Sequence, residues 1–106
     1  MPKAYVIFTE VINDPDGMQA YTRASGPTLA KSGAVVLAVD EKPEVLEGEW
    51  HGQKTVVLEF ESAQAAHAWY DSDAYQEAAG LRRAAAQTNA VIIAGFERPS
   101  GENAGR

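Results

Sequence analysis

Two charged side chains in apolar surroundings are the strongest candidates for chemistry in this sequence. Glu59 lies between Leu58 and Phe60, in a stretch rich in β-forming residues. A carboxylate buried there must be paired or hydrogen-bonded, and burial would raise its pKa toward the range that suits general acid–base catalysis. Arg82 follows Leu81 in a predicted helix, and an inward guanidinium can bind a ligand carboxylate with two hydrogen bonds. We therefore predict Glu59 and Arg82 as catalytic residues.

Both side chains also have a structural interpretation, and the sequence leaves it open. Glu59 could instead form an ion pair or hydrogen bond to a second subunit, with Arg82 or Lys54 as a partner, because structural networks perturb carboxylates as catalytic sites do. Arg82 could equally lie with its aliphatic stem along the surface.

Four aromatic residues are candidate walls of a ligand pocket. Tyr21 and Tyr75 each carry a hydroxyl that must find a partner or reach solvent, which is typical of a pocket wall. Tyr5 and Trp50 are amphipathic as well, and we predict that they contact the same ligand. Trp69, in contrast, is predicted to belong to the core.

The two histidines are weaker candidates. His51 lies in a loop bounded by glycines, where it is either a lid or general base of the site or simply a solvated residue. His67 is expected to face water. Two isolated histidines make no recognisable metal site, and the absence of cysteine excludes thiolate ligands and cysteine nucleophiles. We predict no metal and no bound cofactor.

Composition restricts the partners of this chain. The 106 residues suit one domain, predicted over 1–97, with a flexible tail over 98–106. The net charge of −6 argues against nucleic acid, which needs a basic patch. No apolar run is long enough to cross a membrane, and the start of the chain lacks the pattern of a signal peptide. Together with the lack of cysteine, this predicts a cytoplasmic protein.

The elements that must position these side chains alternate between strands and helices. Asp14 and Pro15 predict a helix start and Gly33 predicts its end, with a kink or two abutting helices at Gly26-Pro27. A second helical segment begins after Ser62 and restarts around Ser72. Strands are predicted over 4–11, 34–39, 54–61 and 90–96, and 44–47 is a possible continuation of the second strand.

The resulting order is β-α-β-β-α-β, which predicts an α+β, ferredoxin-like fold: a four-stranded antiparallel sheet with helices on one face. The strands over 34–39 and 90–96 contain no charged residue, so the uncovered face would expose a large apolar surface. We therefore expect a homodimer that packs sheet against sheet. Its shared face is predicted to contain Val35, Leu37, Val39, Val57 and alternate residues of 90–96. Glu59 falls on the same face, either as a buried polar link of the interface or at the mouth of a site.

Several motifs resemble one known family. They are Glu-Val-Leu-Glu-Gly-x-Trp at 44–50, x-Glu-Phe-x-Ser at 58–62 and Trp-Tyr-x-Ser-x-x-Tyr-Gln at 69–76, with Tyr5-Val6-Ile7, Asp14-Pro15 and Leu81-Arg82. Together they are similar to domain-of-unknown-function family 1330, in the dimeric α+β barrel superfamily. The resemblance covers nearly the whole chain short of the tail. It implies a ferredoxin-like protomer in a face-to-face dimer and supplies no reaction.

The sequence departs from the family pattern at three positions. Val35 and Val39 replace residues that are often basic in the family, and Ala94 replaces a common glutamate. These changes disfavour an anionic ligand. Two functions remain: a cofactor-independent enzyme or binding protein for a small, largely apolar organic molecule, or a non-catalytic dimeric binding or assembly module. A pocket of about 300 Å³ or more with a few polar groups would favour the first.

Overall fold

The structure, a computed structural model, describes residues 2–97 and has the predicted βαββαβ order. The second helical segment is divided in two, as the restart at Ser72 predicted. The elements are β1 (Ala4–Ile12), α1 (Pro15–Ser32), β2 (Val35–Asp40), β3 (Lys54–Phe60), α2 (Ala63–Asp71), α3 (Asp73–Ala85) and β4 (Ala86–Ala94). The predicted tail over 98–106 lies outside these described residues.

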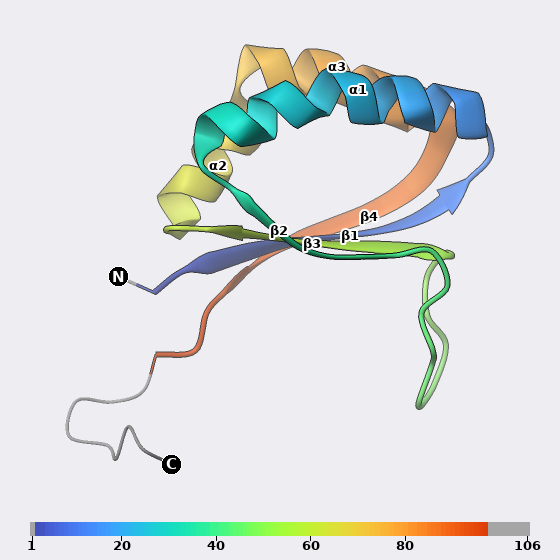
Figure 1. Ribbon diagram of the computed structural model, residues 1–106. Helices are drawn as coiled ribbons and strands as arrows, with labels where there is room; N and C mark the ends of the chain where they lie inside the picture. The colour runs from blue at the N-terminus through green and yellow to red at the C-terminus, as the bar shows by residue number, and fades with distance from the viewer. Residues whose placement is uncertain (1, 98–106) are drawn as a thin grey trace.

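One antiparallel sheet and one layer of helices make up the fold. The strands lie in the order β2-β3-β1-β4, and neighbouring strands are antiparallel. All three helices cover the same face of the sheet, and the other face carries no element of this chain within 2–97 (Figure 1). The ferredoxin-like architecture predicted from the sequence is confirmed.

Capping side chains set the helix ends as predicted. The Asp14 carboxylate accepts a hydrogen bond from the Gly17 amide at 3.2 Å, and Gly33 ends α1 with φ +78°. Ser72 similarly accepts from the Tyr75 amide at the start of α3. The alternative of two abutting helices at Gly26-Pro27 is wrong, because α1 is one helix through Pro27. Glycine before the proline lacks the Cβ that would clash with the proline ring.

Two strand predictions need correction. Segment 44–47 is not a strand, since β2 and β3 stop pairing at Asp40 and Thr55, and the residues between them form a loop. β4 starts at Ala86, four positions before the predicted start at Ala90, because β1 continues to pair with it up to Ile12.

None of the helices within 2–97 is long and apolar enough to span a bilayer.

The core lies between the sheet and α2 and α3. Ala4, Val6 and Phe8 alternate along β1 toward the helices, and Leu58 and Phe60 do so on β3. Trp69 is 4% exposed, as expected for the core, and its ring lies 4.0 Å from that of Tyr75, centroid to centroid. Aromatic packing of this kind is what fixes α2 and α3 on the sheet.

The uncovered face, which we call the open face, is apolar as predicted. Val35 pairs with Glu59 and Val57 pairs with Ile7 on this face, and Val91 is 52% exposed. Val39 was assigned to the same face, and this is wrong. A β-bulge between Val36 and Ala38 shifts the register, with Leu37 at the irregularity, so Val39 pairs with Val56 and faces the helices.

Candidate functional site

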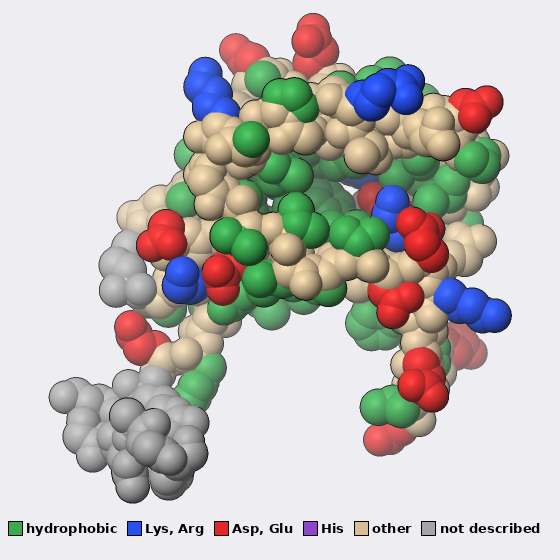
Figure 2. Space-filling view, in the orientation of Figure 1, with side chains coloured by type: hydrophobic (Ala, Val, Ile, Leu, Met, Phe, Trp, Pro, Cys, Tyr) green, Lys and Arg blue, Asp and Glu red, His purple; other side chains and the backbone are tan. Residues whose placement is uncertain are grey.

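A cavity of about 190 Å³, the inner cavity, lies between α1 and the sheet. It exists because α1 does not close down on the β2 edge: Val36 and Val39 point toward the helix layer yet are about half exposed. Figure 2 shows this edge, where apolar side chains surround a hollow between the helices and the sheet. Its lining residues are Phe8, Glu10, Met18, Tyr21, Thr22, Ser25, Leu29, Val36, Val39, Lys54, Val56, Leu58 and Trp69.

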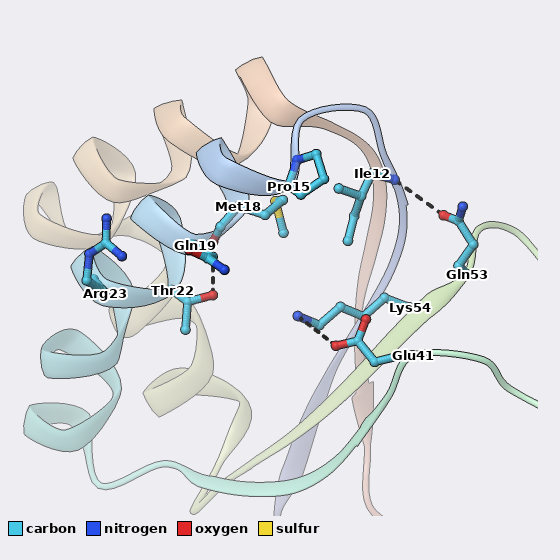
Figure 3. Close-up of a pocket in the computed structure, with 9 residues that line it drawn as sticks. All are labelled: Ile12, Pro15, Met18, Gln19, Thr22, Arg23, Glu41, Gln53 and Lys54. Carbon is cyan, nitrogen blue, oxygen red and sulfur yellow. Dashed lines mark hydrogen bonds and ion pairs between the residues drawn. The ribbon is translucent and has the colours of Figure 1, made fainter.

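A wider groove of about 680 Å³, the outer groove, continues from the inner cavity at the start of α1. The two share Met18, Thr22 and Lys54 as lining residues. In Figure 3 the side chains of Gln19 and Lys54 line this groove from α1 and β3, and Lys54 Nζ lies 3.6 Å from Glu41 Oε2. The outer groove exceeds the volume of about 300 Å³ that favours a ligand site, and the inner cavity alone is smaller than this.

Glu10 is the charged group at the polar end of the inner cavity. It follows Ala4, Val6 and Phe8 on the helix-facing side of β1, opposite Lys54 on β3, and it is 2% exposed. Within residues 2–97, its Oε1 atom has no hydrogen-bond partner. Burial raises the pKa of the Glu10 carboxyl above its ordinary value, against the opposing effects of Lys54 and Arg82.

Arg82 lies behind the wall of this cavity rather than in it. It comes from α3, is 4% exposed, and its Cζ atom lies 5.3 Å from the centre of the Phe8 ring and 5.7 Å from that of Tyr21. Burial alone would lower its pKa, but the phenols of Tyr75 and Tyr21 outweigh burial, so the pKa of Arg82 is raised and it stays charged. It therefore supplies fixed positive charge next to the cavity.

Tyr21 and Tyr75 form a hydrogen-bonded pair beside that guanidinium. Their hydroxyl oxygens are 2.7 Å apart, and the rings meet edge to face. Burial raises the pKa of the Tyr21 phenol, with the neighbouring Tyr75 adding to the shift. The Tyr21 phenol thus remains neutral and can only donate or accept hydrogen bonds.

The structure divides the seven predicted site residues between the two faces of the sheet. Arg82, Tyr21 and Tyr75 come together on the helix side. Glu59 and Tyr5 are register partners on the open face, where Glu59 Oε1 lies 3.7 Å from Lys3 Nζ. Glu59 therefore does not meet Arg82, and the predicted single pocket built on both is wrong in its geometry.

Trp50 and His51 also belong to the open-face side. Trp50 Nε1 donates to Thr55 Oγ1 at 2.9 Å, and His51 Nδ1 lies 2.9 Å from Thr9 Oγ1. Thr9 and Thr55 are register partners whose side chains point away from the helices. The loop that carries Trp50 and His51 is thus anchored away from the inner cavity.

Sequence reasoning missed Glu10 as a site residue. The signal was present, since Glu10 continues the apolar alternation of Ala4, Val6 and Phe8 on β1. The predicted strand over 4–11 already contains position 10, but the burial of its side chain depends on the pairing of β1 with both β3 and β4 and on the helices above them. In the part of the chain that the structure describes, no three acidic or histidine residues are grouped to hold a metal ion.

The comparisons with known proteins agree with this fold. A family model described as Domain of unknown function (DUF1330) matches residues 3–96. No curated protein matches the chain. A solved protein of unknown function from Rhodopseudomonas palustris is 20% identical, with a TM-score of 0.74, and the alignment covers 92% of this chain and 85% of that one.

Two further solved structures are similar at lower identity. SnoaB from Streptomyces nogalater, described as a cofactor-independent oxygenase, is 8% identical over 97% of this chain and 100% of its own, with a TM-score of 0.65. A dimeric ferredoxin-like protein of unknown function from Thermobifida fusca is 16% identical over 88% and 91%, with a TM-score of 0.60. At these identities the likeness establishes the fold.

Proposed function

The chain belongs to the DUF1330 family, whose description assigns no activity, and we propose from its own geometry that it binds a small, largely apolar organic molecule in the inner cavity. The observation that carries this proposal is a buried carboxylate with an unpartnered oxygen, Glu10 Oε1, at one end of a cavity with apolar walls. Binding sites typically combine such walls with a few polar groups.

The size of the inner cavity sets the size of the ligand. An apolar protein cavity of about 150 Å³ is enough to hold benzene, so about 190 Å³ accommodates a molecule with one ring. Leu29, Leu58 and Trp69 supply apolar walls of the inner cavity, and Lys54, the register partner of Glu10, lines both the inner cavity and the outer groove. The apolar part of the ligand therefore points inward, and any larger substituent extends into the groove.

Transformation of the bound molecule without a bound cofactor is the catalytic extension of this proposal. The fold likeness to SnoaB, described as a cofactor-independent oxygenase, supports it at the level of architecture only. The non-catalytic alternative, a binding or assembly module, shares the same cavity and differs only in the absence of turnover. Glu10 is the acid–base group of the catalytic version, because it is the carboxyl that lines the cavity.

The same proposal includes a homodimer through the open face. Val35 and Val91 are about half exposed there, and Ile93 is 46% exposed, so a single chain leaves a contiguous apolar surface in water. A second copy placed on this face would bury it, and the Thermobifida fusca protein, described as dimeric, supports a dimer.

Ligand-observed NMR with toluene tests the binding proposal directly. Wild-type protein should bind toluene saturably. Val36→Phe, which fills the inner cavity, should abolish this binding. Val35→Phe is the matched control, because the adjacent residue points to the open face and should leave toluene binding in place. Equal toluene affinity for Val36→Phe and wild type, or no toluene binding to wild type, would refute the proposal.

A further inference from the structure

Resting on the proposed function, we infer that the ligand of the inner cavity carries one neutral hydroxyl on its apolar body, and that Glu10 selects it by accepting the hydroxyl hydrogen bond. Glu10 is thereby the specificity-determining residue of the cavity. This assigns a chemical class to the ligand: a one-ring phenol or an alcohol of similar size.

The other polar side chains of the inner cavity already have partners. Thr22 Oγ1 donates to the Met18 carbonyl at 3.0 Å, and Ser25 Oγ donates to the Thr22 carbonyl at 3.5 Å. The Tyr21 hydroxyl is paired with Tyr75. Trp69 Nε1 donates to Thr28 Oγ1 at 3.0 Å, and Lys54 lies in an ion pair with Glu41. Among the lining side chains, Glu10 is left with a buried oxygen that has none.

A buried acceptor without a donor is costly, because it has lost its hydrogen bonds to water and gained none in return. A ligand that supplies the donor removes this cost, whereas an apolar ligand of the same size does not. Hydrogen bonds to a charged acceptor are also about twice as strong as those between neutral groups. The cavity should therefore bind a ligand that donates a hydrogen bond to Glu10 Oε1 more tightly than a ligand of the same size without a donor.

The surrounding charges restrict which donor is accepted. Lys54 faces Glu10 from β3 and Arg82 approaches it from α3, and both act electrostatically on its carboxyl. A cationic ligand would be attracted by Glu10 but repelled by both of these cations, so its net gain is small. An anionic ligand would place a second carboxylate against Glu10, and two such groups cannot both stay ionised. A neutral hydroxyl avoids both penalties.

A matched set of one-ring compounds tests this inference by NMR titration: phenol, toluene, benzoate and benzylammonium. Toluene is the more hydrophobic of the first pair, so burial alone would favour it over phenol. We expect phenol to bind wild-type protein about tenfold more tightly than toluene, and more tightly than either ion. Glu10→Gln should lower phenol affinity about tenfold and leave toluene affinity unchanged. Glu59→Gln, on the open face, should change neither.

The outcomes separate this inference from the function on which it rests. If toluene does not bind wild-type protein, the proposed function itself is wrong. If toluene binds but phenol binds no more tightly, or if either ion binds more tightly than phenol, the hydroxyl assignment is wrong and the cavity proposal stands. Comparing the four compounds on wild-type protein separates these outcomes without depending on the folding of any variant. Toluene binding to Glu10→Gln shows that this variant is folded.

Discussion

Glu10 and Lys54 are register partners on neighbouring strands, yet Lys54 Nζ pairs with Glu41 Oε2 at 3.6 Å instead of with Glu10. The carboxylate of Glu10 is thereby left buried beside two cations that do not bond it within residues 2–97. This arrangement does not stabilise the folded chain as an ion pair would, because burial without hydrogen bonds disfavours the charged carboxylate. It is the arrangement expected of a group kept for a ligand.

Glu10→Gln should make the protein more stable at neutral pH. Burial raises the pKa of Glu10 in the folded state, so the folded chain binds its proton more tightly than the unfolded chain. The stabilisation from that proton is complete below the ordinary glutamic acid pKa and is lost as pH rises through the raised value. The variant cannot ionise at this position. Its free energy of unfolding should therefore exceed that of wild type by on the order of 1 kcal/mol at pH 8 and should equal it at pH 4.

Thermal unfolding at pH 4, 6 and 8 measures this difference. Glu59→Gln is the control, because Glu59 is a carboxylate of the same sheet that lies near Lys3 on the open face. A Glu10→Gln variant that is less stable than wild type at pH 8 would show that Glu10 is bonded in the folded protein.

The tyrosine pair should be worth about 1 kcal/mol as a unit. Tyr75→Phe removes one hydroxyl of the 2.7 Å bond and leaves the other, on the half-buried Tyr21, without this partner beside Arg82. Each single variant should therefore lose about 1 kcal/mol, and the double variant should lose clearly less than the sum. Urea unfolding of the four proteins measures the coupling. Strict additivity would mean that the two hydroxyls do not depend on each other.

Glycine 52 should be irreplaceable in the loop between β2 and β3. It has φ +78°, and an added Cβ would collide with the backbone of Glu10. Gly52→Ala should cost more than about 1 kcal/mol and displace Glu10 at the site. Gly80→Ala is the matched control, since nothing lies near its Cβ position in α3 and alanine should stabilise this helix by about 0.5–1 kcal/mol. Chemical denaturation distinguishes the two, and equal stability of both variants would contradict this account.

Charge on the open face should dissociate the proposed dimer. Val91→Asp places a carboxylate at a half-exposed position of β4, where a partner sheet would bury it. Analytical ultracentrifugation at micromolar concentration should show a dimer for wild type and a monomer for Val91→Asp. Gln64→Asp adds the same charge to the helix layer and should stay dimeric. A monomeric wild type would contradict the sheet-to-sheet packing.

The layered fold could be predicted because its signals are local. Asp14, Ser72 and Gly33 are caps that need only a few neighbouring residues, and the alternation around Leu58 identifies the two faces of β3. The orientation of Val39 could not be predicted in this way. It depends on a bulge near Ala38, and nothing in an uninterrupted apolar run marks where one extra residue is inserted.

The candidate site was only half predictable for a similar reason. Arg82, Tyr21 and Tyr75 were identified from their types, and the structure brings them together. Glu59 was chosen because it lies between Leu58 and Phe60, and the sequence left open whether its place on the shared face made it an interface or a site residue. The pairing of β1 with β3 puts it opposite Tyr5 and away from the helices. Neighbouring positions of a strand point to opposite faces of the sheet. Glu59 therefore lies near Lys3 on the open face, whereas Glu10 is buried on the helix side.

Fluorescence of Trp69 offers the most direct measurement of binding in the inner cavity. The chain has two tryptophans, so Trp50→Phe leaves Trp69, which lines the cavity, as the sole emitter. Titration of this variant with nitrobenzene, a one-ring quencher, should give saturable quenching that Val36→Phe abolishes and Val35→Phe preserves. Quenching that rises linearly and equally in all three proteins would contradict a binding site between α1 and the sheet.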